Sequence, residues 1–305
     1  MDLSVHLARR VGAAITALVV LFALSACATS VQTDSAVRNL SPSSVSPQPG
    51  LVPRLSHIVV VVEENHSYSD VIGNGAAPYI NSLARRGANL TNSHGVAHPS
   101  EPNYLALFSG STQGLTDDSC PHSYTTTNLA GQLAAKGLSF ATFSEGLPMT
   151  GYTGCASGHY ARKHNPAPDF TSVSPASNLS ARDFPAPGNA LPTVSFLIPN
   201  LNNDMHDGSI GTADRWLHRH IQSYAQWCGK HNSALVLTWD EDDNSAQNHI
   251  PTIILGAHVR PGKYTEPVSH YNILRTIDQS LGLTPTGLAA RTAPITDVFS
   301  HAHRH

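Results

Sequence analysis

The feature that most limits the fold of this 305-residue chain is the alternation of two apolar patterns from residue 57 onward. Short β-branched runs that end in polar residues are typical of buried strands, and periodic stretches that stop at glycine are typical of helices. The strand-like runs are 57–65, 138–145, 193–200, 234–241 and 252–259, and the helix-like stretches are 78–87, 104–110, 128–137, 212–230 and 270–282. Strands separated by helices predict an α/β fold with a mostly parallel central sheet and helices on both faces.

The composition excludes one broad class of function. Charged residues make up 13% of the chain and hydrophobic residues 40%, which fits a folded globule rather than a disordered chain. The formal net charge is −3, so the chain lacks the basic surplus of a nucleic-acid-binding protein. We therefore expect no nucleic-acid partner.

Residues 1–27 have the pattern of a targeting segment. Arg9 and Arg10 precede an apolar run at 11–24, which is short for a membrane span but fits the core of a signal peptide. The small residues Ser25 and Ala26 before Cys27 resemble a bacterial lipobox. That resemblance implies cleavage before Cys27, lipid modification of this cysteine, and an exported protein tethered to the cell membrane. The alternative is plain cleavage and secretion, with Cys27 present by coincidence.

The rest of the chain divides into a tether, a domain and a tail. Residues 28–56 are rich in Ser, Pro and Gln and have no apolar period, which indicates a flexible linker. Residues 57–299 form the predicted domain, and 300–305 a short tail. Within the domain, residues 145–192 are dense in Pro, Gly, Ser and Asn, which predicts a long excursion over the surface near the functional site.

Three cysteines follow Cys27. Cys120 and Cys155 both lie in loop-like stretches, so in an exported protein we expect them to form a disulfide. Cys228 lies in a helical pattern, and we expect it to be a buried thiol.

Polar side chains follow three of the predicted strands, where an open α/β sheet binds its ligands. Taken singly, such residues are usually solvated loop or helix caps. Four consecutive acids are harder to explain in this way, because like charges raise one another's pKa unless a cation compensates. A hard divalent cation held by carboxylate and amide oxygens is one solution. The residues concerned are Glu63, Glu64 and Asn65; Asp240, Glu241, Asp242 and Asp243; and Asp204, His206 and Asp207.

Ser100 stands in front of a helix-like stretch in "HPSEPNYLALFSG". A serine in this position is most often only an N-cap, and the following Pro102 fits a helix start with Ser100 as the cap. That geometry puts the hydroxyl beside unpaired backbone N–H groups and the positive end of the helix dipole, which favours phosphate. A hydroxyl in such a place can be deprotonated by a nearby metal and attack phosphorus.

Eight segments, in this order, resemble a known family. They are "VVVVEENHSYSD", "HPSEPNYLALFSG", "CPHSYTTTNLAGQLAAKG", "KHNP", "PNLNNDMHDG", "TWDEDD", "NHIPTIILG" and "SHYNILRTIDQSLGL". The family is that of bacterial phosphoesterases, which includes secreted acid phosphatases and phospholipase C enzymes on an alkaline-phosphatase-like fold. The match resembles most the acid phosphatase branch, including mycobacterial secreted acid phosphatases, and it implies that 57–299 is a phosphoesterase domain.

The resemblance implies a set of ligands and a nucleophile. Ser100 matches the nucleophile, and Asn103 resembles the amide that holds a phosphoryl oxygen. One or two divalent cations of open identity are implied, with ligands at Glu64, Asn65, Asp240 and Glu241. Glu241 departs from relatives that carry Asp or another ligand there, and Asp204 is an alternative ligand for a second ion.

His206 in "NDMHDG" and His164 in "KHNP" resemble histidines that contact phosphate or protonate the leaving oxygen. The implied reaction is hydrolysis of phosphate monoesters by double displacement through a phosphoserine at Ser100. Two alternatives stay open. A phospholipase C-type phosphodiesterase uses the same scaffold, although the sequence shows no amphipathic membrane-lying segment. A non-catalytic lipoprotein that binds metal or phosphate is the other.

Overall fold

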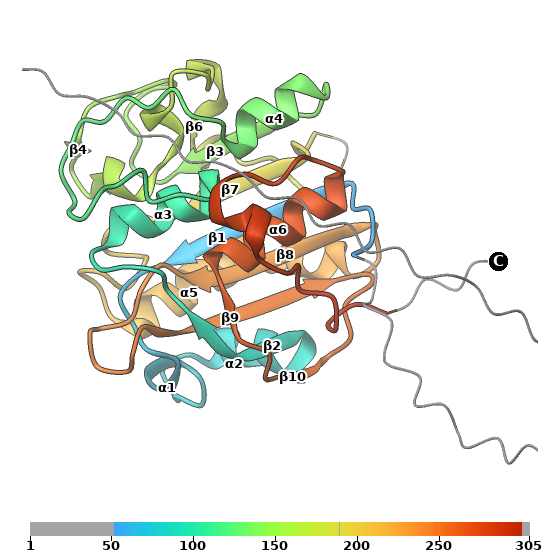
Figure 1. Ribbon diagram of the computed structural model, residues 1–305. Helices are drawn as coiled ribbons and strands as arrows, with labels where there is room; N and C mark the ends of the chain where they lie inside the picture. The colour runs from blue at the N-terminus through green and yellow to red at the C-terminus, as the bar shows by residue number, and fades with distance from the viewer. Residues whose placement is uncertain (1–51, 189, 301–305) are drawn as a thin grey trace, which may run out of the picture. The chain divides into compact units, whose positions relative to one another are not determined.

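The computed structural model describes residues 52–188 and 190–300 (Figure 1). Its core is a nine-stranded sheet in the order β10-β2-β9-β8-β1-β7-β3-β6, with β11 also pairing with β2. The strands are β1 (His57–Glu63), β2 (Ala88–His94), β3 (Phe140–Ser144), β6 (Asn178–Ser180), β7 (Val194–Ile198), β8 (Ser233–Trp239), β9 (His249–Gly256), β10 (Gly262–Tyr264) and β11 (Val268–Ser269). The helices are α1 (Tyr68–Val71), α2 (Pro78–Arg86), α3 (Ser100–Ser109), α4 (Leu129–Ala135), α5 (Ile210–Cys228) and α6 (His270–Leu281). The predicted signal peptide, the lipobox and most of the predicted linker lie outside the described residues, as do residues 301–305.

The prediction of a mostly parallel sheet is confirmed. β1 pairs in parallel with β7 and β8, β3 with β6 and β7, and β2 with β10 and β11. β9 runs antiparallel to both of its neighbours, β2 and β8. The reason is the short connection at 240–248, because antiparallel strands can be joined by a short turn whereas a parallel pair needs a longer crossover.

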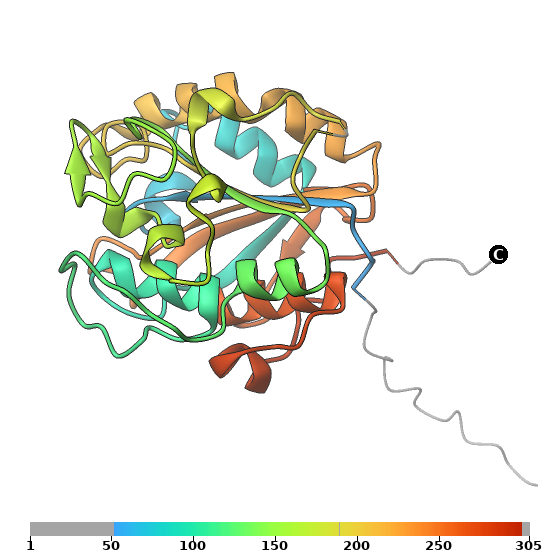
Figure 2. The same cartoon turned by 90° about the horizontal axis from the view of Figure 1, so that it is seen from above.

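Helices cover both faces of the sheet, as Figure 2 shows with α2 and α5 on one side and α3, α4 and α6 on the other. The alternation of side chains along β1 explains the two layers. Ile58, Val60 and Val62 pack into the cluster that contains α3, α4 and α6, and Val59 and Val61 pack into the cluster of α2 and α5. Since both faces are buried, the strand reads as an unbroken apolar run.

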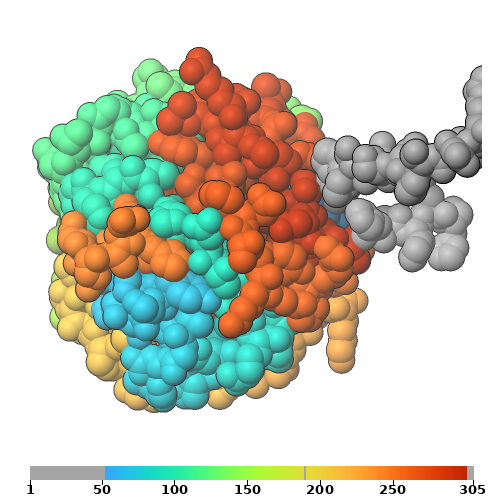
Figure 3. Space-filling view, turned by 60° about the horizontal axis from the view of Figure 1, so that its bottom comes forward, coloured from blue at the N-terminus to red at the C-terminus, as the bar shows by residue number. Residues whose placement is uncertain are grey.

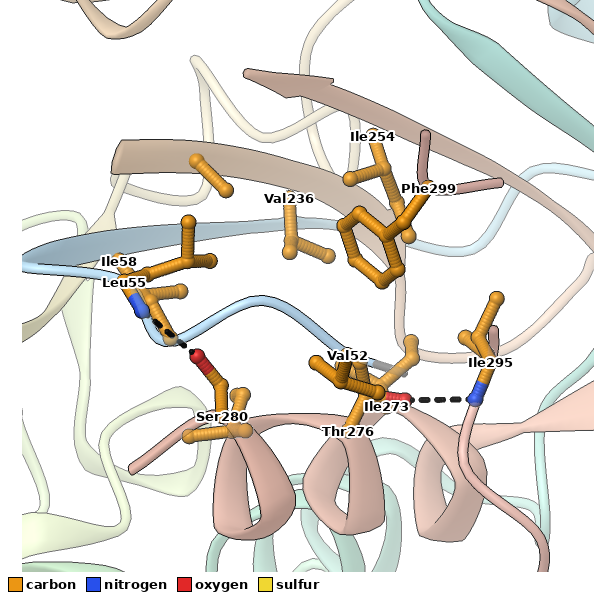
Figure 4. Close-up of a pocket in the computed structure, with 12 residues that line it drawn as sticks. Val52, Leu55, Ile58, Val236, Ile254, Ile273, Thr276, Ser280, Ile295 and Phe299 are labelled. Carbon is orange, nitrogen blue, oxygen red and sulfur yellow. Dashed lines mark hydrogen bonds between the residues drawn. The ribbon is translucent and has the colours of Figure 1, made fainter. Parts of the chain in front are cut away.

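The folded body begins before His57. Val52 and Leu55 are buried, and the Leu55 N–H donates to Ser280 Oγ at 3.1 Å (Figure 4). Both residues line an apolar cavity of about 20 Å³ near the beginnings of β1 and β8. This cavity holds no more than about one water molecule, so it is a packing void, and the last residues of the predicted linker belong to the core.

The predicted excursion at 145–192 contains little regular structure. Two short strands, β4 (Ala156–Ser157) and β5 (Tyr160–Ala161), pair with each other, and β6 joins the edge of the main sheet. Four short 3₁₀ helices lie in the same excursion: η1 (Arg162–His164), η2 (Ala167–Asp169), η3 (Pro175–Ser177) and η4 (Ala181–Asp183). A fifth, η5 (Gly287–Arg291), follows α6.

The cysteine predictions are confirmed. A disulfide joins Cys120 to Cys155, and Cys228 is a buried free thiol in α5. Among the described residues, no helix is both long and apolar enough to cross a membrane.

Candidate active site

Three strand ends converge at one edge of the sheet. Glu63 of β1 lies in register with Trp239 of β8, so Glu64 and Asp240 leave the sheet side by side. The Glu64 N–H donates to the carbonyl of Asp204 at 2.8 Å, which brings in the segment that follows β7. The side chains of Glu64, Asp204 and Asp240 are all buried. The expected convergence of acids from separate strands is therefore present.

Ser100 lies against these acids. Its Oγ is 3.1 Å from Glu64 Oε2 and 3.0 Å from Glu241 Oε1, and the residue is buried. The expectation that Ser100 is the N-cap of its helix is wrong: Pro99 is the cap, and Ser100 is the first residue of α3. The hydroxyl is therefore aimed at the acids from the first turn of the helix.

The two contacts of Ser100 restrict the ionisation of the site. A hydroxyl has a single proton to donate, so it serves Glu64 or Glu241 but not both at once. Two carboxylates that share one hydroxyl need an extra proton or a cation between them. Burial, followed by the charges of Asp240 and Asp204, raises the pKa of Glu64 well above its usual range. Burial, followed by the charge of Glu241, raises that of Asp240 to about 8.

The oxygen ligands expected from the sequence fit a hard cation. Asn65 Oδ1 and Asp240 Oδ2 are buried and have no hydrogen-bond partner, which is costly unless a ligand completes them. The other polar atom of each side chain is held: the backbone N–H of Asn65 donates to Asp240 Oδ1 at 3.2 Å, and Asn65 Nδ2 donates to Glu241 Oε1 at 3.3 Å. Asn65 has a φ of 39°, an uncommon conformation that asparagine tolerates better than most residues. Carboxylate and amide oxygens are the ligands that Mg²⁺ and Ca²⁺ prefer.

Two of the four expected ligands, Glu64 and Glu241, differ from Asn65 and Asp240. In Glu64, Oε1 accepts from Tyr104 and Oε2 accepts from Ser100. Glu241 is engaged in the same way. Its Oε1 accepts from Ser100 and from Asn65 Nδ2, the latter at 3.3 Å, and its Oε2 pairs with His98 Nδ1. Both oxygens thus already have protein partners. His98 also lies 3.4 Å from Asp242 Oδ1, so its ring bridges two residues of the acidic run.

A second set of ligands includes nitrogen. Ligand atoms of Glu64, His164 and His206 lie within 4.8 Å of one another. His164 is buried between acids, with Nε2 3.3 Å from Glu64 Oε2 and Nδ1 3.3 Å from Asp204 Oδ2. Burial lowers the pKa of His164 well below its usual value, so the ring is neutral and able to bind a metal. The two sets share Glu64, which is compatible with one ion or two.

His206 lies at the opening of the site, which we call its mouth. Its side chain is 29% exposed, and its Nδ1 is 2.8 Å from Asp207 Oδ1. Lys163 Nζ donates to Nε2 at 3.3 Å. Since lysine can only donate, Nε2 accepts, and the ring proton lies on Nδ1 facing Asp207.

Asn103 has other partners in this structure. Its Oδ1 accepts from the N–H groups of Val96 and Ala97, and its Nδ2 donates to the carbonyls of Ala97 and Pro99. The amide thereby fixes the loop in front of α3. Its predicted contact with a phosphoryl oxygen stays a prediction.

Two residues at the site escaped the sequence analysis. Tyr104 donates its hydroxyl to Glu64 Oε1 and stacks on His164 with ring centroids 5.2 Å apart. Tyr104 follows Ser100 by four residues, so both lie on one side of α3. Because the surrounding residues are apolar, the sequence pattern indicates only that Tyr104 is buried. The second is Lys163, which directly precedes His164 in "KHNP". A positive charge next to a candidate site histidine is the feature of the sequence that points to it.

A polar groove starts at the site. It is lined by Asn65, His66, Ser69, Asp70 and Asn74 from the segment after β1 and by Asp243 from the segment after β8. The space-filling view shows these two segments side by side on the surface, the first in blue and the second in orange (Figure 3). The groove offers room beside the acids for the alcohol part of a substrate.

Comparisons with known proteins give the fold and the family of this chain. A solved protein of the alkaline phosphatase superfamily from Vibrio parahaemolyticus shares the fold, with a TM-score of 0.55, 13% identity, and coverage of 81% of this chain and 72% of that one. Residues 74–284 match the model of the Phosphoesterase family. The chain belongs to that family and is a hydrolase acting on phosphoric ester bonds.

Two curated relatives are phosphatases. Phosphatidylinositol-3-phosphatase of Mycobacterium tuberculosis is 51% identical over 260 residues, covering 83% of this chain and 87% of the relative. Acid phosphatase of Aspergillus fumigatus is 30% identical over 247 residues, covering 73% of this chain. The matched region spans about half of the fungal enzyme, 54% of its length.

Proposed function

We propose that this protein hydrolyses phosphate monoesters in a metal-dependent reaction that passes through a phosphoserine at Ser100. The observation that carries this proposal is the contact of the buried Ser100 hydroxyl with two carboxylates, Glu64 and Glu241, that leave different strands. A serine is a weak nucleophile unless a neighbouring base or metal removes its proton. These contacts supply a group that can accept that proton.

In the first step, the Ser100 oxygen forms a bond to phosphorus while the bond from phosphorus to the substrate alcohol breaks. The serine proton passes to the acid cluster, and the leaving alkoxide takes a proton from a histidine. In the second step, water attacks the same phosphorus, the bond to Ser100 breaks, the serine oxygen takes its proton back from the acid cluster, and inorganic phosphate leaves. The same histidine accepts the proton of the attacking water.

His206 is the better candidate for that histidine. It is partly exposed at the mouth of the site, where a leaving alcohol departs. His164 is enclosed between Glu64 and Asp204, so its nitrogens face acids rather than solvent. We assign His164 to orienting Glu64, or to binding a cation with it.

Glu64, Asn65 and Asp240 would hold the divalent cation, with Glu241 beside it. Such a cation lowers the pKa of a serine hydroxyl and neutralises charge that develops on the phosphoryl oxygens. The unpartnered oxygens of Asn65 and Asp240 support this assignment.

Monoesters are favoured over lipid phosphodiesters as substrates. Only two large apolar side chains in the described chain are prominently exposed, Met149 and Leu288, which gives little support for an apolar rim that enters a membrane. Both relatives above carry names of phosphatases. If a phosphatidylinositol phosphate is the substrate, its polar inositol headgroup would bind in the polar groove, and its acyl chains would stay outside.

We also propose that the chain is exported and anchored through Cys27. The disulfide between Cys120 and Cys155 supports an oxidising compartment. Incorporation of radiolabelled palmitate into wild-type protein, and its loss in Cys27→Ser, tests the anchor.

The function is tested by a hydrolysis screen with the full chain. p-Nitrophenyl phosphate, a phosphatidylinositol monophosphate and phosphatidylcholine are assayed across pH, after chelation and after addition of single divalent cations. We expect hydrolysis of monoesters that is lost on chelation and restored by at least one cation. Faster cleavage of phosphatidylcholine would favour the phospholipase C alternative.

A further inference from the structure

A lysine at the mouth of the site has no part in the mechanism proposed above. Lys163 Nζ lies 2.8 Å from Asp118 Oδ2 and 3.3 Å from His206 Nε2. Its side chain is 20% exposed, so the ammonium group is held in place and still faces solvent.

Asp118 links this lysine to the nucleophile. Its Oδ1 accepts the N–H of Glu101, the residue after Ser100, at 2.9 Å, while its Oδ2 accepts from Lys163. One carboxylate therefore joins the first turn of α3 to the ammonium group. Lys163 thus contacts His206 on one side and, on the other, a carboxylate that is bound to the first turn of α3.

A positive side chain near Ser100, in addition to the cation proposed above, favours binding of the substrate. The acid cluster around Ser100 consists of Glu64, Asp204, Asp240 and Glu241. A phosphate monoester adds up to two further negative charges near neutral pH. The adjacent Arg162 is not free to help. Its guanidinium pairs with Asp169 and donates to the carbonyls of Thr153, His122 and Pro168.

We propose that Lys163 binds the phosphoryl group of the substrate and selects dianionic monoesters over monoanionic diesters, with Asp118 as a positioning residue. This inference rests on the proposed function and specifies the substrate class of the same site. A compact ammonium charge binds phosphate well, and the second negative charge of a monoester gives it the stronger attraction.

Binding of phosphate also releases His206. When Lys163 turns to a phosphoryl oxygen, its hydrogen bond to His206 Nε2 is given up. This nitrogen then becomes free to take up a proton, which it passes to the leaving alcohol. Substrate binding and the availability of the histidine are thereby coupled through one side chain.

The disulfide holds the two loops that carry this pair. Cys120 lies two residues after Asp118, and the carbonyl of Cys155 accepts the N–H of Arg162, the residue before Lys163, at 2.9 Å. The bond between Cys120 and Cys155 therefore restrains the loops that carry Asp118 and Lys163 relative to each other.

The test compares Lys163→Met with Lys163→Arg and with Lys230→Met, the same substitution at an exposed lysine beyond the end of α5. The first readout is kcat/KM for p-nitrophenyl phosphate and for bis-p-nitrophenyl phosphate. Loss of one charge-assisted hydrogen bond predicts a fall of about 10- to 100-fold for the monoester in Lys163→Met, mainly through KM. The diester should fall less than about threefold, Lys163→Arg should recover part of the loss, and Lys230→Met should match wild type.

A second readout needs no turnover. Calorimetry measures binding of inorganic phosphate and of dimethyl phosphate to Ser100→Ala and to Ser100→Ala combined with Lys163→Met. The added substitution should weaken phosphate about 10-fold or more and leave dimethyl phosphate nearly unchanged. Equal losses for both ligands, or no loss for phosphate, would overturn the role of Lys163. Full hydrolysis by Ser100→Ala would instead overturn the proposed function and leave the binding comparison interpretable.

Asp118→Asn tests the positioning role. Asparagine keeps an oxygen for the Glu101 N–H and removes the charge that holds Lys163. We expect a raised monoester KM in the single variant and no further increase when Asp118→Asn is added to Lys163→Met. Additive effects would show that Asp118 acts independently of Lys163, against the proposal.

Discussion

The hydroxyl oxygen of Ser100 lies 3.1 Å from Oε2 of Glu64, although 36 residues separate them in the chain. Glu64 leaves the end of β1 and Ser100 begins α3, so the contact depends on the packing of α3 against one face of the sheet. The same glutamate also receives the hydroxyl of Tyr104 and faces His164. Glu64 therefore contacts two residues of α3, Ser100 and Tyr104, and His164 of the excursion.

The first prediction concerns the cation. Asp240→Asn should lose bound divalent metal and lower kcat by about 100-fold or more, because it removes the charge of a buried ligand. Asp183→Asn is the matched control, since Asp183 is an exposed aspartate of η4 that belongs neither to the acid cluster nor to the groove. Metal content by mass spectrometry and kcat for p-nitrophenyl phosphate are measured on both. Full turnover of Asp240→Asn with its metal retained would refute this ligand assignment.

The second prediction separates the two histidines by leaving group. p-Nitrophenolate departs without a proton, whereas an alkyl alkoxide needs one. In His206→Asn, kcat/KM for an alkyl phosphate should fall about 100-fold or more, and kcat/KM for p-nitrophenyl phosphate less than about tenfold. His164→Asn should affect both substrates alike, because His164 contacts Glu64 and Asp204. If His164→Asn, rather than His206→Asn, impaired hydrolysis of the alkyl phosphate selectively, His164 and not His206 would be the histidine that protonates the leaving group.

The third prediction is a pH effect on stability at a carboxyl group outside the acid cluster. Both carboxyl oxygens of Asp278 in α6 are buried without a hydrogen-bond partner, and burial raises its pKa from 3.8 to about 7. The folded state therefore holds a proton that the unfolded state loses, so stability falls as pH rises from about 4 to about 7. Over this window the cost reaches at most about 4 kcal/mol.

Asp278→Asn should remove this pH dependence. The variant should be more stable than wild type at pH 8 and similar at pH 4, measured by urea unfolding. Asp183→Asn, at an exposed position, serves as the control and should leave the profile unchanged. An unfolding curve of Asp278→Asn with the wild-type pH dependence would contradict the assignment.

The fourth prediction concerns the disulfide. Replacing Cys120 and Cys155 by serine releases a constraint across 35 residues, which corresponds to about 4 kcal/mol in the chain-entropy account. The melting temperature should fall, and KM for monoesters should rise because the two loops that carry Asp118 and Lys163 are no longer joined. Reducing agent should reproduce both effects in wild type and change nothing in the double variant.

The sequence predicted the layers and most of the acid cluster, because these depend on local patterns. The run at 58–62 is apolar on both faces, which indicates a strand between two layers of helices. The ends of parallel strands meet at one edge of a sheet, which predicts that Glu64 and Asp240 lie close together. The disulfide between Cys120 and Cys155 was expected from their loop-like surroundings.

Other features depend on long-range packing that no local pattern carries. Tyr104 reads as one more buried residue of an apolar helix, and its hydroxyl acquires a role only because α3 packs beside Glu64. Val52 and Leu55 lie in a Pro- and Ser-rich stretch that has no period, yet they fill a gap between β1 and α6. The antiparallel direction of β9 follows from a short connection rather than from its composition.

The most direct measurement of the central claim is trapping of the phosphoenzyme. Protein mixed with a ³²P-labelled monoester is quenched in acid within milliseconds to seconds, digested, and sequenced by mass spectrometry. The account predicts phosphate on Ser100 in wild type, none in Ser100→Ala, and a loss of kcat of at least about 1,000-fold in that variant. Label on another residue, or undiminished hydrolysis by Ser100→Ala, would contradict it.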